Sequence, residues 1–320
     1  MAHELTINEL TGLAEFAYRG THGMPWHHLG QEMPATASLE DWRERAGMNW
    51  SVERSPVQFE AATGPVTIPG KLVLHRSDNS FPLGVVSDSY VPTHPSQMLE
   101  FFRGILKEGG LELSAAGTLQ GGKRFWATAR VADAEPLPGD RMTGFLQILS
   151  SADGSLATTV RRTAIRAVCA NTIRQSMSDA PALTVLHRTE LDLDAVRRFM
   201  GFNVTAWDQF QAQIKALANR PVLTDEAEEL LVPILRTREQ ASDDEVRNSY
   251  GFRTVMDLFS GAGKGARIEG VMGTRWGLLN GVTEFIDHHT RATSAASRLN
   301  SSQFGPGAAI KSRALELLSA

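Results

Sequence analysis

Short apolar segments separated by turn residues fill residues 50–163, and they constrain the fold more than any other feature. The pieces WSVERSPVQFE, KLVLHRS and PLGVVSDSYVP are strand-like, with β-branched residues among polar ones. Farther on, ADGS is a hairpin signal with Asp153 and Gly154 at its tip, so residues 156–162 are expected to return as the partner strand. Hairpin-length connections favour an antiparallel sheet over repeated βαβ units.

Two helices are expected within this part of the chain. Ser38 and Asp41 have the spacing of a capping box and predict a short helix directly after Ser38. The segment PSQMLEFFRGILKEG predicts a longer helix, with Pro95 in its first turn and Gly109–Gly110 at its end. We expect this longer helix to pack on the sheet.

From about residue 164 the apolar period changes to that of a helix. Ile165, Val168, Cys169 and Thr172 have spacings of 0, 3, 4 and 7, which place them on one helical face. After a further strand, LTVLHRT, the remaining chain is predicted to be helical.

These patterns predict an α+β fold, in which an antiparallel sheet with a packed helix precedes a mostly helical C-terminal region. The expected division is an irregular N-terminal segment with a short helix (1–49), an α+β core (50–190) and a helical region (191–320) with a Gly-rich loop at 260–274.

Composition narrows the class of protein. The net charge of −4 over 320 residues argues against indiscriminate binding to nucleic acid or membranes by the molecule as a whole. Cys169 is the only cysteine, so no intrachain disulfide can form, which suits a reducing cytosol. The sequence contains no secretory signal and no apolar run of membrane-spanning length, so we expect a cytoplasmic protein without membrane contact.

The basic residues are unevenly distributed. Residues 155–175 contain four arginines and no acid. If this segment is helical, Arg162, Arg166 and Arg174 form a row that repels itself and that a phosphate chain would neutralise. We therefore predict phosphate contacts from these three residues and Arg161. Two alternatives stay open: acids of residues 190–250 pair with the arginines, or the arginines lie in an oligomer interface.

A second basic segment, QGGKRFWATARV, combines charge with aromatic rings. Strand alternation places Arg124 and Trp126 on one face, and Lys123 and Phe125 on the other. Proteins often hold single-stranded nucleic acid with a basic side chain beside an aromatic ring on one face of a sheet, because the charge contacts phosphates and the ring stacks on a nucleobase. Lys123 and Arg124 would extend the phosphate track and Trp126 would stack on a base; the alternative is that Trp126 is a core residue.

The Gly-rich segment SGAGKGAR resembles a phosphate loop only superficially. Leu258 and Gly265 occupy the positions where a Walker A loop needs Gly and Ser or Thr. We expect no bound nucleotide, but a basic loop whose Lys264 and Arg267 can contact a polyanion.

Two histidine pairs, His27–His28 and His288–His289, are candidates for a metal site, yet neither lies in a recognised ligand spacing. We therefore predict no metal, no cofactor and no catalytic residue. Cys169 falls on the apolar side of the expected helix and is interpreted as a buried thiol rather than a nucleophile.

Several motifs occur together in one order along nearly the whole chain: MPWHHLG, LGVVSDSYVPTHPSQMLEFF, AAGTLQGGKRFWATARV, VRRTAIRAVCANTI and GTRWGLLNGVTEFIDHH. This combination resembles the phage/plasmid-like proteins that are known as a domain of unknown function. The resemblance implies a mobile-element protein in a bacterial cytoplasm and supplies no catalytic residue. The order of elements is also similar to that of phage single-strand annealing proteins, which hold one strand in a basic groove and form rings or filaments.

The leading hypothesis is therefore a non-enzymatic protein that binds and anneals single-stranded DNA in recombination or replication, as a homo-oligomer. One alternative is a metal-dependent enzyme acting on nucleic acid or nucleotides through the histidine pairs. Another is a structural or host-interaction protein that binds no nucleic acid.

Overall fold

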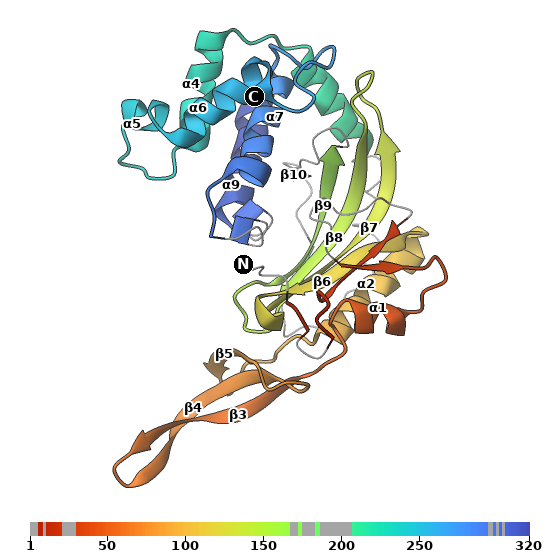
Figure 1. The fold of residues 1–320 in the computed structure, drawn as a ribbon, viewed down its shortest axis with the longest axis vertical. Helices are drawn as coiled ribbons and strands as arrows, with labels where there is room; N and C mark the ends of the chain where they lie inside the picture. Colours follow the sequence, from red (N-terminus) through yellow and green to blue (C-terminus); the bar gives the residue numbers. More distant parts are fainter. Residues whose placement is uncertain are drawn as a thin grey trace.

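The structure is a computed structural model, and it describes residues 6–8, 11–20, 30–166, 172–174, 183–185, 207–293, 297–298, 301–302 and 305–320. Three parts are visible in Figure 1: a curved sheet, a helical region beside it and a long hairpin that projects from the sheet. The predicted α+β class is confirmed.

The described part of the main sheet has eight strands in the order β10-β9-β8-β7-β6-β1-β2, with β11 beside β9. These strands are β1 (Phe16–Arg19), β2 (Gln31–Met33), β6 (Glu112–Leu119), β7 (Arg124–Ala134), β8 (Met142–Ser151), β9 (Thr158–Arg166), β10 (Thr172–Arg174) and β11 (Leu183–Val185). Strands β6 to β9 form the expected antiparallel meander. The sheet is nevertheless mixed, because β1 and β2 pair in parallel.

The predicted turn between β8 and β9 is confirmed. Gly154 has a φ of 76°, a conformation that favours glycine, and the side chain of Asp153 accepts the Ser155 N–H at 2.9 Å. The strand that follows pairs with β8 from Leu149↔Thr159 to Met142↔Arg166.

The expectation that residues 1–49 are irregular is wrong for β1 and β2. β1 pairs with β6, about a hundred residues away in the sequence, and β2 pairs with β1. Their backbone hydrogen bonds depend on this distant partner. The short helix α1 (Leu39–Arg45) is confirmed with its capping box, in which Ser38 and Asp41 exchange hydrogen bonds.

Helices α1 and α2 (Pro95–Gly109) lie on one face of the main sheet, as Figure 1 shows. α2 starts at Pro95 and ends at Gly110, whose φ is 63°, as the sequence predicts. Leu99 and Phe102 of α2 are buried in the same core as Phe125 of β7. This face of the sheet is therefore the first hydrophobic core.

The helical region forms a second core. It contains helical residues 207–218, α4 (Thr224–Leu235), α5 (Asp243–Arg247), α6 (Tyr250–Asp257), the π-helical turn η3 (Leu258–Ala262), α7 (Arg275–Glu284), the π-helical turn η4 (Phe285–His289) and α9 (Pro306–Ser319). Within the described ranges, the helical prediction is confirmed; residues 192–206 lie outside them. Trp276 is fully buried in this core and donates its indole N–H to Asp140, in the β7–β8 turn, at 2.8 Å. This bond ties the helical region to the sheet.

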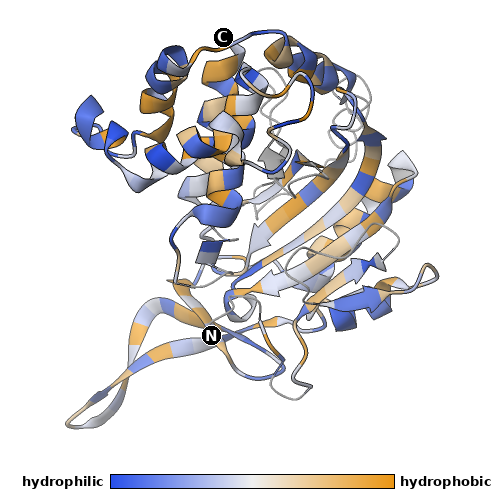
Figure 2. Ribbon diagram, turned by 45° about the horizontal axis from the view of Figure 1, so that its top comes forward, coloured by the Kyte–Doolittle hydropathy of each residue, from blue (hydrophilic) through white to orange (hydrophobic). Residues whose placement is uncertain are grey.

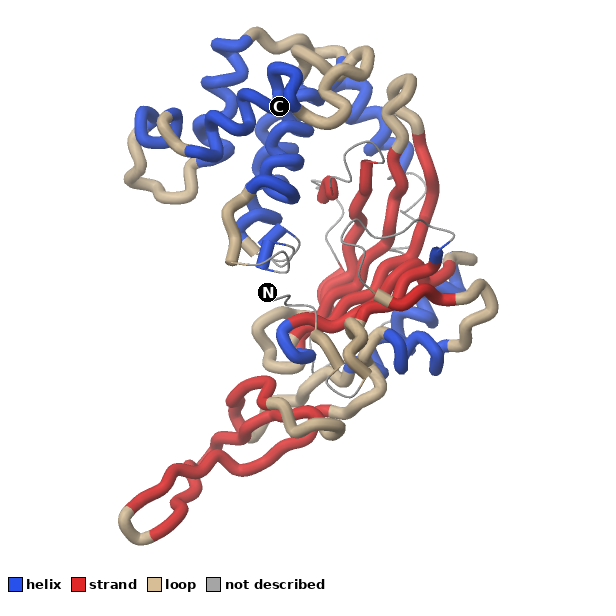
Figure 3. Tube along the Cα trace, viewed as in Figure 1, coloured by secondary structure: helices blue, strands red, loops and turns tan. Residues whose placement is uncertain are grey.

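A second sheet is built from β3 (Val52–Ala61), β4 (Gly64–Arg76) and β5 (Pro82–Ser87), paired antiparallel. β3 and β4 form the projecting hairpin, defined as residues 52–76. Val52 and Leu74 at its base belong to the first core, and its outer part extends away from both cores (Figures 1 and 3). Among the described residues, the structure contains no helix with the length and apolarity needed to cross a membrane.

A buried ionic cluster fixes the base of the projecting hairpin. Arg76, 1 % exposed, donates to both carboxylate oxygens of Glu15 at 2.9 and 3.0 Å and to those of Asp78 at 2.7 and 2.9 Å. Its guanidinium also lies over the Trp50 ring, 4.6 Å from the centroid. Burial alone would lower the pKa of Arg76, but the hydrogen bonds to Asp78 and Glu15 outweigh burial and raise it. The hairpin is therefore attached at its base to Glu15, the residue directly before β1.

Candidate nucleic-acid interface

The arginine-rich segment continues as strand beyond the expected residues 156–162, whereas a helix was expected from about residue 164. Residues 158–166 form β9 and residues 172–174 form β10, which pairs antiparallel with β9. The helical row of Arg162, Arg166 and Arg174 is therefore wrong. The spacing 0, 3, 4, 7 fits a helical face, but pairing with β8 and β10 satisfies the backbone instead, and Thr and Val at 158–160 suit a strand.

The first two arginines of β9, Arg161 and Arg162, are not exposed on its surface. Arg161 and Arg162 are 8 % and 9 % exposed, and as neighbours in a strand they point to opposite faces. Arg161 donates from Nε to the side chain of Gln147, its cross-strand partner, at 2.9 Å. Burial lowers the pKa of Arg162. Both residues are thus corrected from phosphate contacts to buried members of the sheet.

Arg166 and Arg174 are described by their backbone alone. The structure gives their backbone, in β9 and β10, but their side chains and Cys169 lie outside the described residues. The phosphate contacts predicted for Arg166 and Arg174 therefore stay a prediction, and the alternative that acids of residues 190–250 pair with them stays open.

Strand β7 carries the second basic segment. Burial alternates along its first residues, with Phe125 fully buried in the core under α2 and Arg124 and Trp126 half-buried. The predicted shared face of Arg124 and Trp126 agrees with this alternation. The strand position predicted for Lys123 is wrong, because this residue ends the short 3-10 turn η2 (Gln120–Gly122) before β7 begins.

The Trp126 face continues onto β1 as an aromatic row. The ring of Phe16 lies 5.5 Å from that of Trp126, and the ring of Tyr18 lies 6.1 Å from that of Phe16. Register agrees, because Gly117 of β6 is paired with both Trp126 and Phe16. The alternation in FAYR could have indicated this strand, but only its pairing with β6 brings the two rings beside Trp126. We call Arg124, Trp126, Phe16 and Tyr18 the aromatic face. Phe16 and Tyr18 are 2 % and 8 % exposed and form a small core under Trp126, so Trp126 is the ring of this face that reaches the surface.

Trp126 is not a fully satisfied core residue. Its indole N–H is shielded from solvent and has no hydrogen-bond partner in the part of the chain that the structure describes. A shielded donor without an acceptor costs free energy.

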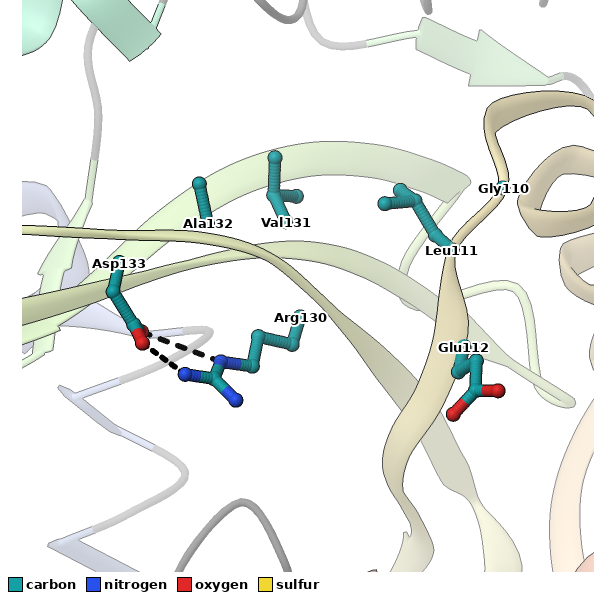
Figure 4. Close-up of a pocket in the computed structure, with 7 residues that line it drawn as sticks. All are labelled: Gly110, Leu111, Glu112, Arg130, Val131, Ala132 and Asp133. Atoms are coloured by element: carbon teal, nitrogen blue, oxygen red, sulfur yellow. Dashed lines mark hydrogen bonds and ion pairs between the residues drawn. The ribbon is translucent and has the colours of Figure 1, made fainter. Parts of the chain in front are cut away.

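Arg130 lies farther along the same face of β7. It lines an open depression of about 370 Å³ together with residues 110–112 and 131–133. Figure 4 shows its guanidinium directed at Asp133, with which it forms an ion pair. Because Asp133 neutralises Arg130, this depression offers less positive charge than the sequence suggests.

The Gly-rich loop places Lys264 and Arg267 at the surface. Both are exposed, and neither has an ion pair among the described residues. The backbone N–H of Lys264 is already used, because it donates to the buried carboxylate of Glu284 at 3.0 and 3.2 Å. Because this N–H is already bonded, the loop backbone is poorly suited to bind a phosphate, as its sequence also indicates. The side chains of Lys264 and Arg267 can still contact an anion.

Of the two histidine pairs, the structure describes only His288–His289. His27 and His28 lie outside the described residues. His289 lies 3.9 Å from the Glu284 carboxylate, and the described residues contain no group of three or more His, Cys, Asp or Glu suited to a metal ion.

Comparison with known proteins assigns a family. Residues 82–304 match the model of a domain of unknown function, DUF932, a span that covers most of the chain and includes β6 to β9 and the helical region up to residue 304. Neither the curated proteins nor the solved structures contain a match. The chain therefore belongs to the DUF932 family, whose function is unknown.

Proposed function

We propose that this protein binds single-stranded DNA without catalysing a reaction and promotes the annealing of complementary strands, as a homo-oligomer in phage-type recombination or replication. The observation that supports binding is the aromatic face. Arg124 supplies charge for a phosphate, and Trp126 presents a half-buried ring that packs on the buried rings of Phe16 and Tyr18. Single strands are commonly held by such a pairing of cations with a stacking ring.

Lys123 precedes Arg124 and extends the basic track. Lys264 and Arg267, exposed on their loop, are more distant contributors. The proposal does not depend on Arg161 and Arg162, because their side chains are buried.

Annealing, the phage context and assembly into a ring or filament rest on the resemblance of motifs and element order rather than on the geometry of the face. They need a separate assay, in which the rate of pairing of two complementary labelled strands is measured with and without the protein.

The binding test is a fluorescence-anisotropy titration with a labelled oligothymidylate at two salt concentrations. Phosphate-driven binding weakens as salt rises, with a slope of about −0.7 for each neutralised phosphate of a single strand. Trp126→Ala should weaken binding by about 1–3 kcal/mol, whereas Trp126→Phe, which keeps a ring, should retain most of the affinity.

Arg103→Ala is the matched control, because Arg103 is an exposed arginine on α2, away from the aromatic face. It should leave the affinity unchanged. Absence of binding at low salt, or equal affinity for the Trp126→Ala variant, would overturn the proposal.

A further inference from the structure

The sheet of β3, β4 and β5 has one face against the first core and another toward solvent. Val52 and Leu74 are buried in that core, so strand alternation places their neighbours in sequence on the opposite side. This opposite side is open, because Val85 of β5, which pairs with Val73 of β4, is 61 % exposed. Figure 2 shows hydrophobic and hydrophilic residues following one another along this sheet. We call the opposite side the open face.

Three polar side chains of the open face lie in contact. His75 pairs with Glu53 across the strands, and Ser55 lies on the same face, two residues farther along β3. The Ser55 hydroxyl lies 2.9 Å from Nε2 of His75, and a Glu53 carboxylate oxygen lies 3.8 Å from Nδ1. The side chain of His75 is 19 % exposed and that of Glu53 is 55 % exposed, so solvent reaches this group. We call Ser55, His75 and Glu53 the serine–histidine cluster.

A backbone carbonyl sets the tautomer of His75. Nδ1 lies 3.3 Å from the carbonyl oxygen of Arg76, which can only accept a hydrogen bond, so Nδ1 carries the proton. In the neutral ring Nε2 is then an acceptor, and the Ser55 hydroxyl donates to it. Arg76 is anchored by its ion pairs with Glu15 and Asp78, which keeps this carbonyl in place.

The serine–histidine cluster has the order of an activated nucleophile: a hydroxyl, a base within hydrogen-bond reach, and groups that orient the base. Glu53 adds a negative charge on the Nδ1 side, which favours the imidazolium that forms when Nε2 takes a proton. Ser87 of β5 also belongs to the open face, but its hydroxyl bonds to that of Ser89 at 3.1 Å. A second hydroxyl is no base, so Ser87 provides an internal control.

The surroundings of Ser55 suit an acyl group. Lys71 pairs with Ser87 of β5, so it also belongs to the open face. It lies two residues from Val73, the cross-strand partner of Ser55, a separation that a long side chain can span. Lys71 is exposed and forms no ion pair in the described part of the chain, so its ammonium can stabilise negative charge that develops on an oxygen next to Ser55. Val73 and Val85 supply apolar surface for the acyl chain.

We infer that Ser55 is a nucleophilic serine that takes an acyl group from an activated ester, with His75 as its base. Ser55 Oγ forms a bond to the carbonyl carbon while His75 Nε2 takes the hydroxyl proton. The bond from that carbon to the leaving oxygen then breaks, and Nε2 returns the proton to the departing alcohol. The products are a protein that carries an ester on Ser55 and the free alcohol. This acylation goes beyond the proposed DNA binding and does not depend on it.

The test is covalent labelling of the full chain with a fluorophosphonate, which reports the same attack at phosphorus. Ser55 Oγ bonds to phosphorus, fluoride leaves, and the hydroxyl proton passes through His75 to solvent. Intact-mass spectrometry should show a single phosphonyl group on the chain, and peptide mapping should place it on Ser55 rather than on Ser87. p-Nitrophenyl acetate, an activated ester, should transfer a single acetyl group to the same residue.

Matched variants separate activation of the hydroxyl from its exposure. Ser55→Ala should lose the adduct, and His75→Gln, which keeps a polar side chain but supplies no base, should slow labelling at least about 100-fold. Ser87→Ala, which changes an exposed serine of the same face, should be labelled as the wild type is. Glu53→Gln removes a charge but leaves the Arg76 carbonyl, so it should slow labelling less than His75→Gln does. Far-ultraviolet circular dichroism and thermal unfolding confirm that each variant is folded.

Three results would overturn the inference: a wild type that takes up neither group, labelling of Ser87 as fast as that of Ser55, or a His75→Gln variant that is labelled at the wild-type rate. The second result would show that exposure alone decides reactivity, and the third would make the bond between Ser55 and His75 purely structural. DNA binding is measured separately by anisotropy, so the failure of either proposal leaves the other standing.

Discussion

Replacing Arg76 by methionine should destabilise the protein strongly, because it leaves a buried carboxylate without its cation. Arg76 and Glu15 are 1 % and 3 % exposed, and the guanidinium makes two hydrogen bonds to the Glu15 carboxylate, at 2.9 and 3.0 Å. In the variant, Thr118, which donates to Glu15 at 2.6 Å, is the side-chain donor that this carboxylate keeps. Methionine is similar in length but supplies neither charge nor donors.

Breaking one side of a buried ion pair costs about 3–5 kcal/mol. For a chain of this size, each kcal/mol corresponds to about 2–4 °C, so the melting temperature of the Arg76→Met variant should fall by roughly 6–20 °C. Urea unfolding followed by tryptophan fluorescence and circular dichroism measures the free energy of unfolding directly.

Two further variants make the measurement specific. Arg103→Met on α2 removes an exposed arginine and should change the free energy of unfolding by less than about 0.5 kcal/mol. Adding Glu15→Gln to Arg76→Met removes the uncompensated charge and should restore part of the loss. If Arg76→Met costs less than about 1 kcal/mol, or if the double variant is no more stable than the single one, the buried-charge account is refuted.

Three other perturbations have defined outcomes. Asp140→Ala removes the acceptor of the Trp276 indole N–H and should lower the free energy of unfolding by about 1.5–3 kcal/mol in a urea titration; an unchanged midpoint would contradict this role. Gly122→Ala should be destabilised, because Gly122 has a φ of 96° and a Cβ there would meet a buried indole at 2.6 Å, and thermal unfolding would show it. Burial, with a smaller contribution from Arg54, lowers the pKa of His94, whose neutral ring accepts the Val52 N–H at 3.0 Å. The stabilisation by the neutral His94 ring is present above the pKa of the unfolded state, about 6.5, and is lost as the pH falls through the lower pKa of the folded state. His94→Asn should therefore flatten the fall in melting temperature below pH 6.5. An unchanged pH profile would argue against this role of His94.

Local signals in the sequence predict several elements well, because their causes lie within a few residues. The capping box of Ser38 and Asp41 starts α1, and Pro95 and Gly110 bound α2. Asp153–Gly154 turns the chain between β8 and β9. In each case the stabilising hydrogen bond or the required φ belongs to the segment itself.

The strand β1 and the strand character of residues 164–166 were not predictable in this way. Both depend on partners supplied by other segments: β6 for β1, and β8 for β9. A short apolar pattern fits more than one secondary structure until its neighbour is known, and pairing then decides between them.

Charge shows the same division between sequence and tertiary structure. The sequence alone determined that four arginines stand together without an acid, and that Arg124 and Trp126 alternate with Phe125. Only the fold decided that Arg161 and Arg162 are buried while Trp126 lies beside Phe16. The physical reason is that the exposure of a side chain depends on which other layers cover its strand, and those layers come from distant parts of the chain.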